Sequence, residues 1–147
     1  MTIQRRNFYI RTTGAVIGAL FAIWAFAACA TISTYDALAY EKVTACKAEV
    51  LNVMSKATTS YEDHRAEVEA VSLDVAKAQE YDRNRPLNQI TVSMWELIRD
   101  PARDTSAGFF KLWKAKGTLH QGYIDEKKIQ VGQAFDQIAQ LESGKLR

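Results

Sequence analysis

The chain has 147 residues with 19 basic and 17 acidic side chains, so its formal net charge is only +2. Three arginines lie in the first 35 residues, which leaves 16 basic and 17 acidic residues and a net charge of −1 for the rest. A nearly neutral body lacks the basic surface that contacts with nucleic-acid phosphates require, so we expect no nucleic-acid partner. With two prolines and seven glycines, the sequence favours an all-α fold of long helices.

An uncharged stretch runs from Thr12 to Tyr35 and divides the chain into segments 1–35 and 36–147. It is long enough for a transmembrane helix, because about 20 apolar residues span a bilayer. Arginines precede it, and such residues stay on the cytoplasmic side. We therefore expect a bacterial inner-membrane protein with its body, residues 36–147, in the periplasm. Membrane lipid around residues 12–35 is then an expected partner.

The same stretch fits a secretory signal peptide, with a basic start, an apolar centre and small residues at its end. Residues 25–27 and 28–30 each match an A-x-A cleavage pattern. The sequence Phe26-Ala27-Ala28-Cys29 also resembles a bacterial lipobox, which implies cleavage before Cys29 and lipidation of that cysteine. Three alternatives stay open: a retained membrane helix, a lipoprotein anchored at Cys29, and a cleaved soluble protein. Each of them delivers the body across the membrane.

The body begins with the pattern of one long helix from Asp36 to Arg85, which Pro86 would end. Its apolar side chains recur in steps of three and four along a narrow heptad seam, with one irregular step between Ala57 and Tyr61. The seam positions are Val43, Cys46, Val50, Val53, Ala57, Tyr61, His64, Val68, Val71, Val75 and Ala78. Because a lone helix would leave this seam in water, we expect it to contact another helix, a protein partner or a second copy of the chain.

The second half of the body predicts a short amphipathic helix and then a long one. Residues 87–99 form the short helix, with Leu87, Ile90, Met94, Leu97 and Ile98 on one side and Trp95 beside them. Helical periodicity also predicts a last helix from about Leu119 to Glu142. Folding the two long arms back about a tip near Val92 pairs Val43 with Leu141, Cys46 with Ile138, Val50 with Ala134, Val53 with Val131, Tyr61 with Tyr123 and Val75 with Phe109. The sequence thus predicts a coiled-coil-like antiparallel helical hairpin with a short amphipathic tip helix.

The body contains no motif of a known catalytic or phosphate-binding class, so we expect a non-enzymatic protein without a cofactor. The hairpin places His64 opposite His120, but a metal site would need further ligands, and we expect no metal. Four aromatic residues near three lysines are candidates for contact with a membrane surface or a protein partner. They are Trp95, Phe109, Phe110 and Trp113. The alternative is that they close the distal end of the hairpin.

Lys42–Asn52 follows the predicted anchor and resembles the first long helix of the LemA-type envelope proteins. The resemblance covers eleven residues and implies an N-terminally anchored bundle of long helices, although the Pro-Asn-Leu-containing motif of that family is absent. No function is carried over from this resemblance. The predicted anchor and the helical body predict a membrane-anchored bacterial envelope protein that serves as a helical scaffold or adaptor. The alternative is a membrane-active protein, spanin-like or fusion-like, whose aromatic and basic tip engages a bilayer.

Overall fold

All regular structure between residues 32 and 146, the part of the chain that the computed structural model describes, is helical. This confirms the all-α class for that part of the chain. The elements are α2 (Ala37–Met54), η1 (Tyr61–His64, a 3-10 helix), α3 (Arg65–Arg83), α4 (Gln89–Arg99), α5 (Ser106–Lys116) and α6 (Gln121–Gly144). None of these helices is both long and apolar enough to cross a membrane. The predicted anchor falls almost entirely on residues outside the described range.

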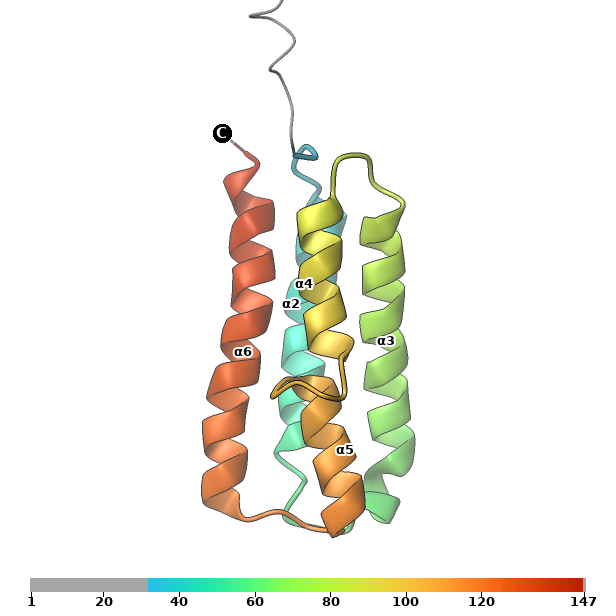
Figure 1. Cartoon of the computed structure of the whole chain (residues 1–147), viewed down its shortest axis with the longest axis vertical. Helices are drawn as coiled ribbons and strands as arrows, with labels where there is room; N and C mark the ends of the chain where they lie inside the picture. Colours follow the sequence, from blue (N-terminus) through green and yellow to red (C-terminus); the bar gives the residue numbers. More distant parts are fainter. Residues whose placement is uncertain (1–31, 147) are drawn as a thin grey trace, which may run out of the picture. The chain divides into compact units, whose positions relative to one another are not determined.

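The helices form an antiparallel bundle with four arms (Figure 1). α2 lies between α3 and α6, and α4 contacts the same two helices from the other side. α4 and α5 follow one another along the third arm, so that each covers about half of its length (Figure 1). In this arrangement each amphipathic helix buries its apolar stripe against its neighbours, which is the source of stability in helix bundles.

The single long helix predicted from Asp36 to Arg85 is wrong, because α2 ends at Met54 and the chain reverses before α3. The reversal falls on residues 55–60, at the irregular step of the seam. Backbone hydrogen bonds attach this turn to the loop before α6: Leu119 N donates to Ala57 O at 2.8 Å and Tyr61 N donates to Gly117 O at 2.9 Å. Four shorter arms therefore replace the predicted two-armed hairpin.

The first and last helices, α2 and α6, do run antiparallel. Lys47 Nζ lies 2.5 Å from Asp136 Oδ1, and Lys128 donates a hydrogen bond to Ser55 at the other end of the pair. These contacts are within one residue of the register in which the sequence pattern paired the two segments. Beyond Met54 the predicted pairing does not apply, because α3 turns back alongside α2.

The buried face of α4 differs from the predicted one. Thr91, Trp95 and Ile98 are buried, whereas Leu87, Ile90 and Leu97 are exposed. The Trp95 ring meets Phe135 edge to face with centroids 5.9 Å apart. Burying the indole removes more apolar surface from water than burying one aliphatic side chain, so the tryptophan sets the orientation of this helix.

Candidate functional site

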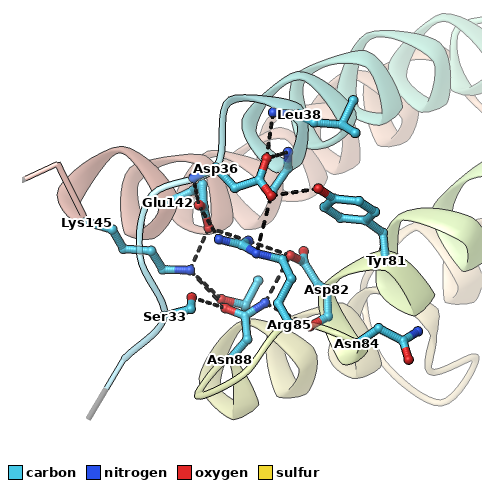
Figure 2. Close-up of polar contacts among 12 residues, drawn as sticks. Ser33, Asp36, Leu38, Tyr81, Asp82, Asn84, Arg85, Asn88, Glu142 and Lys145 are labelled. Atoms are coloured by element: carbon cyan, nitrogen blue, oxygen red, sulfur yellow. Dashed lines mark hydrogen bonds and ion pairs between the residues drawn. The ribbon is translucent and has the colours of Figure 1, made fainter. Parts of the chain in front are cut away.

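A cluster of polar and charged side chains occupies the end of the bundle where residues 32–36 lead into α2 (Figure 2). We call it the entry cluster. It consists of Ser33, Asp36, Tyr81, Asp82, Arg85, Asn88, Glu142 and Lys145. Its members come from the segment before α2, the end of α3, the α3–α4 loop and the end of α6. The antiparallel arrangement brings these segments to the same end of the bundle.

Arg85 is the centre of the entry cluster and is largely buried. Its guanidinium donates to Asp82 Oδ1 at 2.8 Å and to both carboxylate oxygens of Glu142 at 2.8 and 3.0 Å. It also donates to the carbonyl oxygen of Thr34 at 2.6 Å. Bidentate hydrogen bonds between ionised groups are among the strongest in proteins. They raise the pKa of Arg85 above its ordinary value, with the bonds to Glu142 as the main cause.

Asp82 is only 2% exposed, yet three donors satisfy its carboxylate. Besides Arg85, Asn88 Nδ2 donates to Oδ1 at 2.9 Å and Trp95 Nε1 donates to Oδ2 at 2.6 Å. A buried carboxylate is tolerated only when it is paired and hydrogen-bonded in this way. The bond from Trp95 also explains why α4 turns its indole inward.

Glu142 is 1% exposed and receives donors from three directions. In addition to Arg85, Lys145 Nζ donates to Oε2 at 2.5 Å, and the backbone N–H of Asp36 donates to Oε1 at 2.7 Å. Burial alone would raise the pKa of Glu142, but the hydrogen bonds from Arg85 and Lys145 outweigh burial and lower it. Glu142 is therefore held in its ionised form inside the bundle.

The entry cluster fixes the segment before α2 to the bundle. Ser33 N donates to Leu87 O at 2.9 Å, and Ser33 Oγ donates to Asn88 Oδ1 at 2.8 Å. Asp36 caps α2 by accepting the backbone N–H groups of residues 38 and 39. Tyr81 donates its hydroxyl to Asp36 Oδ2 at 2.6 Å, which is the main reason that the pKa of Asp36 is lowered and that of Tyr81 raised.

Residues before Asp36 take part in these contacts. The compact unit that includes the bundle starts at Ile32. The division into an anchor at 1–35 and a body at 36–147 stays a prediction from the sequence pattern. The hydroxyl of Ser33 gives a structural reason for one polar residue in the uncharged run, because it donates to Asn88 Oδ1. Thr34 contributes only its backbone carbonyl oxygen.

The groups of the entry cluster satisfy one another. Among the residues that the structure describes, every buried side-chain nitrogen or oxygen has a hydrogen-bond partner. Three carboxylates, from Asp36, Asp82 and Glu142, face the cations of Arg85 and Lys145. A network satisfied in this way makes the local geometry rigid. The arrangement is therefore suited to holding chain segments together.

The four aromatic residues that the sequence singled out, Trp95, Phe109, Phe110 and Trp113, are all buried. The Trp113 indole N–H lies 3.1 Å from the carbonyl oxygens of both Thr59 and Gly117, and its ring meets Tyr61 edge to face. It thereby fixes the turn between α2 and α3 against the end of α5. This burial favours the packing alternative over a membrane or partner contact for these side chains.

The two histidines have separate partners. His64 Nδ1 lies 2.9 Å from Glu67 Oε1, and His120 Nδ1 accepts the backbone N–H of Gly122 at the start of α6. Among the described residues, no group of three or more histidine, cysteine and acidic side chains is placed to hold a metal ion. Cys29, the candidate for lipidation, lies outside the described residues.

Sequence reasoning missed the entry cluster, although a signal for it is present. Asp82 continues the seam of Val75 and Ala78 in steps of three and four, and Glu142 continues the stripe of Phe135 and Ile138 in the same way. Charged residues at seam positions near the ends of two helices predict a buried ion pair there. Their common partner, Arg85, could not be identified without knowing that the ends of α3 and α6 meet.

The chain matches no protein-family model, and neither the curated proteins nor the solved structures gave a significant match. The resemblance of Lys42–Asn52 to LemA-type proteins therefore gains no support from these comparisons. Proposals about function rest on the sequence pattern and on the geometry of the bundle.

Proposed function

We propose that the protein is a membrane-anchored bacterial envelope protein whose helical bundle is a non-enzymatic scaffold or adaptor on the outer side of the inner membrane. The uncharged run Thr12–Tyr35, with arginines before it, supports the anchor and its orientation. A lipid anchor at Cys29 is the alternative means of attachment and places the bundle on the same side.

The observation that carries the proposal is the attachment of residues 32–36 to the bundle. Ser33, Thr34 and Asp36 each hydrogen-bond to a different part of the entry cluster. A body joined by a flexible linker would sample many orientations relative to its anchor. A body that holds the last residues of the uncharged run leaves little free chain between the bundle and the predicted anchor. Such a short connection suits a protein that presents a binding surface at a set distance from a membrane.

The length of the bundle fits this role. α6 has 24 residues, which correspond to about 36 Å at 1.5 Å per residue. The end opposite the entry cluster, with the turn at 55–60 and the loop at 117–120, lies at the other end of this helix (Figure 1). An adaptor of this size extends beyond the headgroup layer toward its partners.

The membrane-active alternative requires side chains that are inside the bundle. Trp95 and Trp113 are fully buried, and both indole N–H groups have hydrogen-bond partners. Engaging a bilayer through them would require α4 and α5 to leave the core. No contact in the described structure favours that role.

Fractionation of cells that produce the full chain with a C-terminal tag tests the proposal. We expect the chain to stay with the membranes after carbonate extraction, and protease added to spheroplasts to remove the tag. Radioactive palmitate incorporation that is lost in Cys29→Ser would identify the lipoprotein form, and no incorporation would identify the retained helix. A soluble cytoplasmic chain, or a tag protected in spheroplasts but digested after lysis, would contradict the proposal.

The adaptor role needs a separate measurement. Lysine-reactive cross-linking in intact cells should give discrete adducts of the full chain with other envelope proteins. Recovery of the uncross-linked chain alone, under conditions in which known envelope complexes are captured, would contradict an adaptor and leave the anchoring intact.

A further inference from the structure

Four exposed apolar side chains belong to segments that meet at the end of the bundle that holds the entry cluster. Ile32, Leu87, Ile90 and Leu146 are 40%, 45%, 57% and 67% exposed. We call them the end face. The hydrogen bond from Ser33 N to Leu87 O places Ile32 beside the α3–α4 loop, and Ile90 lies one turn further along.

Lys145, the residue before Leu146, attaches the end of α6 to the neighbouring segments. Lys145 Nζ donates to Asn88 Oδ1 at 2.9 Å and to Thr91 Oγ1 at 3.5 Å, so the end of α6 contacts the start of α4. Leu146 follows directly. The four apolar side chains thus come from three separate segments that the entry cluster ties together.

Leu87 has an unusual backbone conformation. Its φ of 57° makes it the one non-glycine residue with a positive φ among those described. This region is unfavourable for a leucine by about 1–2 kcal/mol. Core burial does not compensate for the strain, because the side chain is exposed. Strained conformations that persist in this way are often found at functional positions.

The sequence before the bundle indicates what faces these side chains. Within the uncharged run Thr12–Tyr35, the strongly apolar part is Gly14–Ala30, and only Thr31 separates it from Ile32. Two residues of fully extended chain cover at most about 7 Å. Each interfacial layer of a bilayer is about 5–8 Å thick, since about 30 Å of hydrocarbon lies within a total of about 40–45 Å. The reach of Ile32 from the apolar segment is therefore comparable with the thickness of the headgroup layer.

We propose that the end face, formed by Ile32, Leu87, Ile90 and Leu146, sits in the headgroup layer of the bilayer from which the chain emerges. The inference rests on the proposed anchoring by the preceding segment. Apolar side chains at this depth are removed from water at the boundary with the acyl chains, which is favourable. Contact at several points holds the bundle upright, whereas a single tether would let it tilt.

Fluorescence quenching of the full chain in lipid vesicles tests the proposal. An environment-sensitive NBD dye is attached to Ile90→Cys, and to Ile129→Cys as the matched control, because Ile129 is exposed on α6 away from the end face. Leu146→Cys provides a second position on the end face. Cys46 is buried and burial raises its pKa to about 11, so its thiol reacts slowly at neutral pH. The labelled wild-type chain supplies the background.

The vesicles contain phosphatidylethanolamine and phosphatidylglycerol with a lipid quencher whose nitroxide lies near the headgroups. We expect several-fold stronger quenching and blue-shifted emission at positions 90 and 146 than at 129. Equally weak quenching at all three positions, in chains that float with the vesicles, would overturn the inference and leave the anchoring intact. Chains that do not float would overturn both the anchoring and the inference.

Discussion

Replacing Arg85 with methionine tests whether the entry cluster stabilises the bundle. The substitution keeps much of the apolar stem but removes the cation between Asp82 and Glu142, which are 2% and 1% exposed. Removing one partner of a buried ion pair typically destabilises a protein by about 3–5 kcal/mol. Each carboxylate here keeps other donors, from Asn88 and Trp95 in one case and from the end of α6 in the other. We therefore expect the lower end of that range, about 3 kcal/mol.

The measurement is urea and thermal unfolding of the full chain in mild detergent, followed by far-ultraviolet circular dichroism. For a body of this size, about 3 kcal/mol corresponds to a fall in Tm of about 10 °C. Arg83→Met is the matched control, because Arg83 is exposed and its partners, Glu80 and Glu96, are surface residues. Surface pairs contribute about 0–1 kcal/mol, so the control should unfold close to the wild type.

A double-mutant cycle with Glu142→Gln separates the ion pair from general disruption. Because Arg85 and Glu142 are in direct contact, we expect a coupling energy of more than about 1 kcal/mol. If Arg85→Met unfolds no more easily than Arg83→Met, or if the two cluster substitutions are additive, the stabilising role assigned to Arg85 is refuted.

Three further outcomes are expected from the contacts of the entry cluster and from the backbone conformation of Leu87. The pKa values of Asp36 and Glu142 are lowered in the folded chain. Their carboxylates therefore stabilise the fold fully only above the pKa values of the unfolded chain, 3.8 and 4.5. The free energy of unfolding should thus fall as the pH drops below about 4.5. The variant Glu142→Gln should be less stable than the wild type at pH 7, but its stability should depend less on acid pH. Urea unfolding at a series of pH values measures both effects. The free energy of unfolding of Leu87→Gly should lie within about 1 kcal/mol of the wild-type value, because relief of the positive φ offsets the flexibility of glycine. In the control Leu73→Gly, within α3, the free energy of unfolding should fall by about 1 kcal/mol. A fragment of residues 32–147 should have a free energy of unfolding at least about 2 kcal/mol higher than a fragment of residues 37–147. The shorter fragment loses the α2 cap and the charged hydrogen bonds of the entry segment. Equal Tm values for the two fragments would contradict this.

The helical seam shows how far the sequence pattern leads. Val43, Val50, Val68 and Val75 are buried as predicted, because a helix has the same spacing of inward positions in any bundle. The reversal between α2 and α3 was not predicted, since two helices with the same stripe give the same period as one longer helix. The irregular step between Ala57 and Tyr61, among serines and threonines, was the only local sign of it.

Tertiary contacts decided that reversal. The turn is held by hydrogen bonds to Gly117 and Leu119 and by the Trp113 indole, which lie more than 50 residues further along the chain. The orientation of α4 has the same kind of cause. Its apolar residues define two overlapping faces, and the bond from Trp95 to Asp82 together with the contact with Phe135 selects one of them.

The sequence by itself determined the helical class, the inward positions of the seam and the predicted position of the anchor. These depend on local periodicity and on an unbroken run of uncharged residues. The tertiary structure alone decided the number of arms, the orientation of α4 and the assembly of the entry cluster. The reason is physical: Ser33, Arg85 and Glu142 are far apart along the chain, and only the packing of antiparallel helices brings their polar groups within hydrogen-bonding distance.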